Sequence, residues 1–405
     1  MKSISIAVLF CVAVLTSCTK DKITQPKVLP AITQKHQQAV ALSNNFGIDL
    51  YQEIKNEEVA DKNIIISPLS ANMALSMLLN GAKDGTEDAI LNTLRINTDV
   101  TANNQTCRDL MDFLPNVDPA VTLGIANSIW YRSGFSVLNS FLDVNQSNFD
   151  AQISTLNFSA PNAKNIINSW VENATNKKIK ELIDEVSADH VMFLINATYF
   201  NAPWKTTFDK SETQNMLFQL TNGNSIQVPM MFSNKIEMDY FTDSNIEMVG
   251  LPYGKGNYNF YAILPKTNND LAQLENNFTT AEWHNWINNA QKVKNYGLYM
   301  PKFELDYEIT MNKALTAMGM GVAFSNDANF TGISDAEKLM VSKVKQKTYI
   351  KVDEEGTEAA AATSVEVVFT SLPPTVSFNR PFMFVISEKT TGAILFMGRI
   401  MKPIK

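Results

Sequence analysis

DEEGTEAAAATSVEVVFTSLPP occupies residues 353–374, and the interpretation of the whole chain depends on it. The polar residues 354–356 form a flexible start, and the pair Pro373-Pro374 forms a stiff, extended end. The sixteen residues between them, 357–372, contain no glycine, no proline and no basic side chain. A segment of this composition can follow the period of a β-strand over its full length.

Read as a strand, this segment has two different faces, because alternate side chains point to opposite sides. One face is uncharged and consists of Thr357, Ala359, Ala361, Thr363, Val365 and Val367. Both charges, Glu358 and Glu366, lie on the other face. The first face can therefore be buried in a sheet without burying a charge, and its small N-terminal half can slip between strands already in place.

A helix is the alternative for the start of this segment. The residues TEAAAAT, 357–363, have high helix propensity, and Thr357 could act as the N-cap. The valine-rich continuation and the proline pair argue against a stable helix.

The segment EEGTEAAAAT, 354–363, resembles the hinge of the reactive loop of inhibitory serpins. Eight further motifs resemble serpin motifs and fall in the family's order and spacing along nearly the whole chain. They are SPLS at 67–70, NATYF at 196–200 followed by Trp204, VPMM at 228–231, LPY at 251–253, PKF at 301–303, AFS at 323–325 with FTGI at 330–333, FNRPF at 378–382 and LFMGR at 395–399. One such tetrapeptide would be weak support, but eight in order are specific.

The resemblance implies an α+β fold. We expect a single large domain with a five-stranded main sheet, two further sheets, eight or nine helices and an exposed reactive loop at about residues 354–374. The coarse pattern of the chain agrees, since helical periodicity gathers early and strand-like segments gather late, without the strict alternation of an α/β fold.

Local patterns predict particular elements. Ser67 followed by Pro68 is an N-cap and first-turn pair, which opens a helix through Leu79. Thr86 is expected to cap a shorter helix through Leu94. Strands are expected at 121–131, 190–200, 296–305 and 339–352.

The resemblance implies a suicide inhibitor of proteases rather than an enzyme. In this family a protease attacks a bond in the exposed loop, and after acylation the N-terminal part of the loop inserts as a new middle strand of the main sheet. Inserting about 14 residues at ~3.3 Å each would carry a covalently attached protease on the order of 45 Å. The hinge that must enter first comprises Glu354, Glu355, Gly356, Thr357, Glu358, Ala359, Ala360, Ala361, Ala362 and Thr363. Its small, uncharged Thr357, Ala359 and Ala361 stand where non-inhibitory members often have bulky or charged residues, which favours inhibition.

Two counts place the cleaved bond between Thr370 and Ser371. One count runs forward from Gly356, which matches the family's flexible glycine, and the other runs back from Pro373-Pro374. Cleavage one residue earlier, at Phe369-Thr370, is the alternative, because phenylalanine offers the larger side chain to the primary specificity pocket of a protease.

The residues before this bond indicate the class of target. No lysine or arginine occurs between Val352 and Asn379, so a protease whose primary pocket holds a carboxylate finds no partner there. Thr370 and the residues Val367 and Val368 suit the small or aliphatic pockets of elastase-type and subtilisin-type proteases. Phe369 suits papain-like cysteine proteases, and a chymotrypsin-like enzyme would have to cut after it.

Two further sites are implied by the resemblance. Ser67, Ser70 and Asn196 match the family's shutter, where the main sheet opens, and Trp204 matches the breach, where insertion begins. Gln346 stands where many members have a shutter histidine. Glutamine can donate and accept hydrogen bonds, so we expect a network there but no pH-dependent shutter.

The N-terminus reads as a targeting segment. Lys2, an apolar run at 4–15 and the box LTSC ending at Cys18 make residues 1–17 resemble a bacterial lipoprotein signal, in which the cysteine becomes the lipidated first residue of the mature chain. An ordinary secretory signal is the alternative. Residues 18–33 read as a polar tether and 34–405 as the serpin domain. We expect an exported protein, held in the outer membrane by a lipid anchor and facing the periplasm or the cell surface.

Composition argues against several other functions. The net charge is −7 with mixed signs and no basic stripe, which argues against a nucleic-acid partner. Besides Cys11 and Cys18 only Cys107 is present, so no internal disulfide is expected in the mature chain. The three histidines lie outside any metal-binding motif, and no nucleophile elbow or phosphate-binding loop occurs.

We therefore expect a monomer without cofactor or metal, whose partner is a target endopeptidase in a covalent complex. A binding or carrier lipoprotein that keeps the fold but traps no protease is the alternative. A hydrolase is disfavoured by the missing nucleophile and base.

Overall fold

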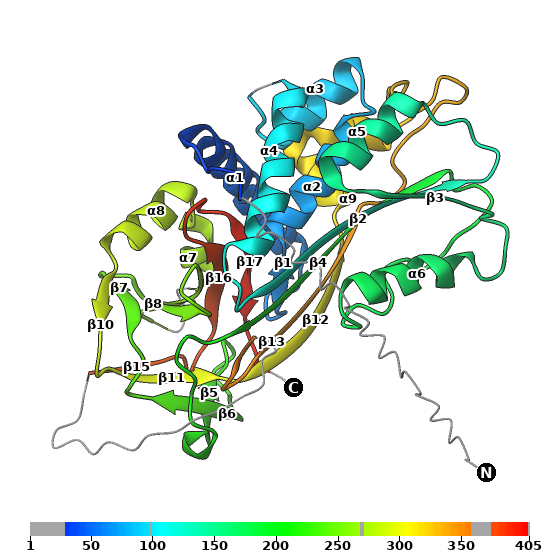
Figure 1. Ribbon diagram of the computed structural model, residues 1–405. Coiled ribbons are helices and arrows are strands. Elements are labelled where there is room, and N and C mark those ends of the chain that lie inside the picture. Colours follow the sequence, from blue (N-terminus) through cyan, green and yellow to red (C-terminus); the bar gives the residue numbers. More distant parts are fainter. Residues whose placement is uncertain (1–28, 98, 268–270, 358–373, 404–405) are drawn as a thin grey trace, which may run out of the picture.

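The computed structural model describes residues 29–97, 99–267, 271–357 and 374–403, and Figure 1 shows how their elements are arranged. Cys18, the hinge residues 358–363 and the region 367–371 around the predicted cleavage bond lie outside the described residues. The predicted reactive loop, 354–374, is therefore described only at 354–357 and at Pro374.

The strands form four hydrogen-bonded groups. The largest is an antiparallel sheet in the order β1 (Ile64–Ile66), β17 (Ile394–Ile400), β16 (Phe382–Glu388), β9 (Tyr258–Pro265), β8 (Ile246–Tyr253), β7 (Met238–Thr242) and β10 (Gln291–Val293). A second sheet has the order β15 (Thr375–Ser377), β11 (Gly297–Pro301), β6 (Ser225–Ser233) and β5 (Gln214–Gln219). The third has the order β14 (Gly356–Thr357), β4 (Met192–Pro203), β2 (Thr122–Arg132) and β3 (Gln152–Leu156), and the fourth pairs β12 (Phe303–Thr310) with β13 (Lys345–Val352).

The expected five-stranded main sheet corresponds to two groups of strands, β3, β2 and β4 in one and β13 and β12 in the other. In the described part of the chain they hydrogen-bond in two groups rather than as one continuous ladder, because β4 pairs with β2 and β14 while β13 pairs with β12. The two-residue strand β14 follows directly after β13 and pairs with the end of β4. The start of the reactive loop thus lies where these two groups meet.

Nine α-helices lie in the described ranges. They are α1 (Gln34–Glu57), α2 (Pro68–Leu79), α3 (Asp84–Thr93), α4 (Val100–Phe113), α5 (Asn139–Phe149), α6 (Ala163–Ala174), α7 (Leu271–Asn277), α8 (Thr280–Asn289) and α9 (Asn312–Leu315). Figure 1 shows α2, α4 and α5 on one side of the long strands β2 and β4, and α6 on the other. The fold is α+β, as expected.

Two cores lie on the two sides of β2 and β4, because alternate side chains of a strand point to opposite faces. Ile129 of β2 belongs to the large core, whereas the adjacent Trp130 packs with Ile195 of β4 and Val171 of α6 in a smaller second core. The long strands are consequently covered on both faces, which explains why apolar side chains can follow one another directly, as at Ile129 and Trp130.

The structure confirms the helix opened by Ser67, whose hydroxyl accepts a hydrogen bond from the amide of Ser70. The prediction that Thr86 caps a helix was wrong. The helix α3 begins at Asp84 after Lys83, which makes no side-chain cap, and the buried Thr86 hydroxyl instead accepts a bond from the Asn329 amide at 2.8 Å. A partner that lies 243 residues away in the chain could not be inferred from local pattern.

The single strand predicted at 296–305 was also wrong. The chain passes there from one sheet to another, with β11 ending at Pro301 and β12 beginning at Phe303. The break between the two strands lies at Lys302, whose amide donates to the carbonyl of Pro229 at 3.0 Å. The strand expected at 339–352 is shorter, since β13 begins at Lys345.

Candidate functional site

The hinge of the reactive loop begins as a tight turn between β13 and β14. The amide of Asp353 donates to the carbonyl of Gly356 at 3.0 Å, and the Glu355 amide donates to the Asp353 carboxylate at 3.0 Å. Gly356 has a φ of 147°, which L side chains rarely adopt. A Cβ at this position would lie 2.2 Å from the carbonyl oxygen of Ala202. Only glycine therefore lets the chain reverse so close to β4.

Three acidic residues of this turn are paired with lysines from three different segments. Asp353 lies 2.8 Å from Lys351 of β13, Glu354 lies 2.7 Å from Lys302, and Glu355 pairs with Lys210. All three acidic residues are buried, and Glu354 is only 2% exposed. A buried carboxylate is costly unless it is paired, so these lysines stabilise the position of the turn.

The pKa of Glu354 reflects a balance of two effects. Burial raises the pKa of its carboxyl group. Hydrogen bonds from Lys302 and from the Thr213 hydroxyl, which lies 2.8 Å away, lower this pKa by more than burial raises it. The net pKa is below the ordinary value, so Glu354 stays ionised at neutral pH. Glu355 likewise raises the pKa of Lys210 through their hydrogen bond.

Trp204 lies directly against the hinge. Its indole nitrogen donates to the Asp353 carbonyl at 2.8 Å, and its backbone amide donates to the Glu355 carbonyl at 2.8 Å. The indole ring stacks on Tyr253 with the ring centroids 4.5 Å apart and the planes 7° from parallel. The hydroxyl of Tyr253 in turn lies 2.6 Å from the hydroxyl of Thr357, which is 2% exposed. The structure thus brings the predicted breach residue, Trp204, and the hinge residue Thr357 together.

The predicted shutter residues also lie together, around the N-terminus of α2. Gln346 of β13 accepts from the amide of Ser67 and donates to its carbonyl, both at 2.9 Å, and the Ser67 hydroxyl donates to Leu395 at 2.7 Å. The Ser70 hydroxyl donates to Asn196 of β4. One end of α2 therefore contacts both strand groups of the main sheet through neutral hydrogen bonds.

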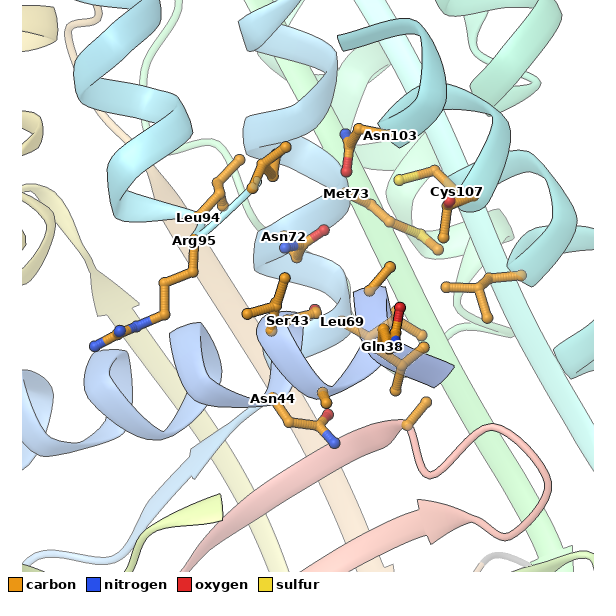
Figure 2. A pocket seen from close by; sticks show the side chains of 18 of the residues that line it. Gln38, Ser43, Asn44, Leu69, Asn72, Met73, Leu94, Arg95, Asn103 and Cys107 are labelled. Carbon is orange, nitrogen blue, oxygen red and sulfur yellow. The ribbon is translucent and has the colours of Figure 1, made fainter. Parts of the chain in front are cut away.

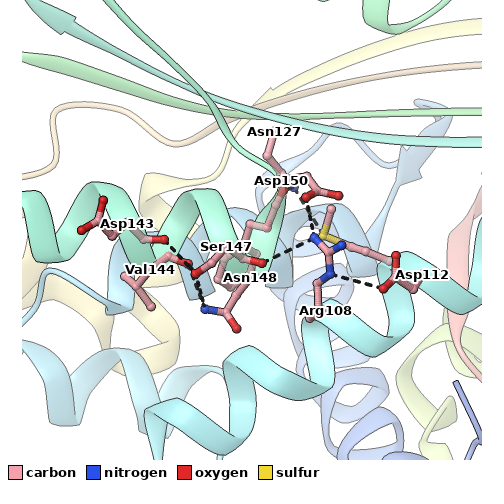
Figure 3. A network of polar contacts seen from close by, with 10 residues as sticks. Arg108, Asp112, Asn127, Asp143, Val144, Ser147, Asn148 and Asp150 are labelled. Carbon is pink, nitrogen blue, oxygen red and sulfur yellow. Dashed lines mark hydrogen bonds and ion pairs between the residues drawn. The ribbon is translucent and has the colours of Figure 1, made fainter.

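Asn127 of β2 extends this cluster. It accepts a hydrogen bond from Asn196 at 2.7 Å and donates to the carbonyl of Phe149 at the end of α5 at 2.7 Å. The next residue, Asp150, pairs with Arg108 of α4, and Figure 3 shows this guanidinium between Asp150 and Asp112. The shutter cluster is thereby linked to the helices α4 and α5.

Sequence reasoning did not single out several of these residues. Tyr253 and Lys302 lie inside two of the motifs that resemble serpin motifs, LPY and PKF. The sequence did not predict that their side chains contact the hinge. Asn127, Lys210 and Thr213 carry no local signal, because their partners are 69, 145 and 141 residues away in the chain.

The described residues contain no group of three or more histidine, cysteine, aspartate or glutamate side chains able to hold a metal ion. Among the helices of these residues, none is both long and apolar enough to cross a membrane.

Comparison with known proteins decides the family. The family model described as "Serpin (serine protease inhibitor)" matches residues 41–403. The chain belongs to the serpin family. Serpins are protease inhibitors rather than catalysts, so a protease is the general class of partner.

Relatives span nearly the full length of this serpin. An "Uncharacterized serpin-like protein" of Methanosarcina acetivorans is 31% identical over 100% of this chain and 99% of its own length. A "Serine protease inhibitor" of Cyanea capillata is 31% identical over 85% of this chain and 93% of its own.

Solved structures agree with the fold. Human thyroxine-binding globulin has a TM-score of 0.84 and 29% identity, covering 91% of this chain and 100% of its own. Tengpin, a thermophilic serpin in the native state, has a TM-score of 0.83 and 33% identity over 93% of this chain and 97% of its own.

Proposed function

We propose that this serpin is a suicide-type inhibitor that traps a serine endopeptidase after attack at Thr370-Ser371. The hydroxyl oxygen of the protease serine attacks the carbonyl carbon of Thr370, and the bond to the Ser371 nitrogen breaks. The hydroxyl proton passes through the protease's own general base to the departing amine of Ser371. The product is an ester between the protease and Thr370, and a papain-like cysteine protease would form the corresponding thioester.

The position of β14 is the observation that carries this proposal. Gly356 lies opposite Pro203 and Thr357 opposite Ala202, in an antiparallel ladder that begins directly after β13. If the same register continued along β4, Val367 would lie opposite Met192, the first residue of that strand. The inserted segment would then cover the whole of β4, about 36 Å at ~3.3 Å per residue.

The composition of the loop fits this register. The face that begins with the buried Thr357 continues through alanine, threonine and valine, so it can enter the sheet without a charge. Glu358 and Glu366 fall on the opposite face. An inserted strand would satisfy backbone groups on both of its edges, at about 1 kcal/mol net for each hydrogen bond. This free energy would favour insertion of the loop. Insertion must be complete before water hydrolyses the ester between Thr370 and the protease.

The target is proposed to be of elastase or subtilisin type. Val367, Val368 and Thr370 suit small or aliphatic pockets, and the loop offers no basic side chain to a trypsin-like pocket. Phe369 leaves a papain-like protease as a second target class.

The test mixes the mature protein with neutrophil-type elastase, subtilisin, a papain-like protease and trypsin, followed by denaturing gels and mass mapping of the released C-terminal peptide. We expect an adduct that survives denaturation, with elastase or subtilisin, and a peptide that begins at Ser371. A peptide that begins at Thr370 would move the cleaved bond to Phe369-Thr370. Cleavage by all four without any adduct would contradict trapping.

The last outcome would favour a carrier with the serpin fold. This alternative has specific support, because a neighbouring structure in the same fold is thyroxine-binding globulin in complex with thyroxine. Cleavage without an adduct separates the two functions in one gel.

Export and lipid anchoring at Cys18 complete the proposal. The support is the signal-like sequence of residues 1–18. Cys18→Ala should move the protein from the membrane fraction to the soluble exported fraction, whereas Cys11→Ala, within the signal, should leave it in the membrane fraction. Retention of the Cys18→Ala protein in the membrane would contradict the lipid anchor.

A further inference from the structure

A cavity of about 440 Å³ lies between the helices α1, α2 and α4, far along the chain from the hinge residues. Its wall also includes the turn that follows α3 and the first residue of β17, Ile394. Figure 2 shows the side chains that line it. Small-molecule sites in proteins have volumes of about 300 to 1,000 Å³, so this space is large enough for a ligand.

Most of the cavity wall is apolar. Its apolar lining includes Leu69, Met73, Leu94, Cys107, Leu110 and Ile394. All six are buried residues of the main core. Such a wall favours the hydrocarbon part of a ligand over water.

One buried polar side chain of this wall lacks a partner. Asn72 of α2 is 7% exposed, and its carboxamide makes no hydrogen bond within the described residues. Figure 2 shows this side chain projecting from α2 into the cavity. Because this amide faces the cavity and has no partner in the described part of the protein, a ligand that supplies one gains a hydrogen bond there.

The two other asparagines of α1 and α4 that line the cavity, Asn44 and Asn103, differ from Asn72, because they have partners inside the protein. Asn44 donates to the carbonyl of Gly392 at 2.8 Å and accepts from the amide of Ile394 at 3.1 Å. Asn103 donates to the Ser76 hydroxyl at 3.2 Å. The unsatisfied hydrogen-bonding capacity of the buried wall is thus concentrated at Asn72.

The charges around the cavity indicate the sign of the ligand. No aspartate or glutamate lines it, whereas Lys35 and Arg95 do. Arg95 is paired with Asp49 at 2.6 Å, so its charge is compensated, while Lys35 is exposed on α1 and has no ion pair within the described residues. A cationic ligand would meet only like charge, and an anion would be attracted to Lys35.

We propose that this cavity is a binding site for a small amphiphilic carboxylic acid, with its hydrocarbon part against the apolar wall and its carboxyl group on the Asn72 amide. The amide nitrogen of Asn72 donates to a carboxylate oxygen, and Lys35 contributes a favourable charge at the rim. This site does not depend on the proposed protease trapping, since none of its residues belongs to the hinge or to the reactive loop.

The experiment compares three probes with the same ten-carbon chain by titration calorimetry on the mature protein. They are decanoate, decanol and decyltrimethylammonium. We expect decanoate to bind with one site per chain, decanol at least about tenfold more weakly, and the cation not at all, because each 1.4 kcal/mol of lost interaction is a factor of ten. Equal binding of all three, or binding of none, would overturn the proposal.

Two variants locate the site. Asn72→Leu replaces the amide with an apolar side chain of similar size, so we expect a melting temperature equal to or above that of the wild type and a loss of decanoate affinity of at least about tenfold. Wild-type affinity in this variant would overturn the assignment to this cavity.

Lys35→Glu changes only the exposed rim and tests the site independently of the core. We expect it to weaken decanoate by about threefold to tenfold and leave decanol unchanged. Lys177→Glu, at a distant surface position, is the matched control and should change neither. An equal loss of decanoate and decanol affinity in Lys35→Glu would contradict the role of its charge.

Discussion

The hinge and the shutter lie along the same strand, β4, but they are held by different forces. Asp353, Glu354 and Glu355 at the hinge are held by ion pairs with lysines, whereas Gln346 and Asn196 at the shutter make neutral hydrogen bonds to the start of α2. Neutral hydrogen bonds do not titrate between pH 4 and 8, and carboxylates do so only at the acidic end.

The difference shows how β4 and β13 are linked through α2 at the middle of β4, whereas the start of the loop already pairs with the end of β4. At the hinge, two residues of the loop already pair with β4, and the turn can be extended without breaking the ladder. At the shutter, α2 bridges β4 and β13, so a strand that inserts between them must displace these hydrogen bonds. In the proposed mechanism the hinge would therefore start insertion and the shutter would resist it.

Thr357→Arg should have the largest effect, because it places a charge in the first buried position of the inserting face. We expect the adduct with the target protease to fall by a factor of 100 or more, on the order of 3 kcal/mol, while loop cleavage continues. Gel densitometry measures the ratio of adduct to cleaved product. Thr221→Arg, in an exposed turn, should leave that ratio unchanged. A stable adduct with the Thr357→Arg protein would show that this residue need not enter the sheet.

Cleavage of the loop should raise the melting temperature by on the order of 10 °C or more. About ten new backbone hydrogen bonds at about 1 kcal/mol each would join the two strand groups of the main sheet. Calorimetry of the intact and cleaved proteins measures the shift. A cleaved protein that melts at the same temperature as the intact one would contradict insertion.

Gln346→Leu should destabilise the intact protein by about 2 kcal/mol. The substitution leaves the buried amide of Ser67 without its partner, which costs more than the bond itself contributes. The carbonyl of Ser67 loses the bond from Gln346 but still accepts from the amide of Ala71 at 3.1 Å. Urea unfolding at pH 7 and at pH 5 should give the same loss, since no ionisable group is involved. Gln227→Leu, on an exposed strand position, is the control and should change stability by less than about 0.5 kcal/mol. A loss at pH 5 that differed from the loss at pH 7 would mean that ionisable groups contribute to the shutter.

Glu354→Gln should have the smallest effect, about 1 kcal/mol of lost stability at pH 7. Because the folded pKa of Glu354 is lower than its ordinary value of 4.5, its ionised form stabilises the folded state above that pH. This contribution is lost as the pH falls below about 4.5 and through the folded pKa, so the difference between wild type and variant should shrink on acidification. Urea unfolding between pH 7 and pH 3 measures it, and Glu185→Gln, on the surface, is the control. A difference that grew towards acid would reverse the sign of the pKa shift.

Sequence reasoning reached the family, the α+β class and the helix that Ser67 opens, because each depends on residues that are close together in the chain. It also identified Gly356 as the flexible residue, and the structure adds why no other residue fits there. Two of its errors, at Thr86 and at Lys302, share one cause. In both cases a hydrogen bond to a distant segment, from Asn329 to Thr86 and from Lys302 to Pro229, overrode the local pattern.

The sequence by itself determined the loop: a glycine that permits the turn, a face without charge and an end stiffened by two prolines. Only the tertiary structure decided how the start of that loop, residues 353–357, is held. The lysines that pair with the hinge carboxylates, the hydroxyl of Tyr253 beside Thr357 and the unpartnered amide of Asn72 follow from contacts between segments far apart in the chain. Local composition sets which backbone conformations are accessible, and long-range packing selects the partner of each buried polar group.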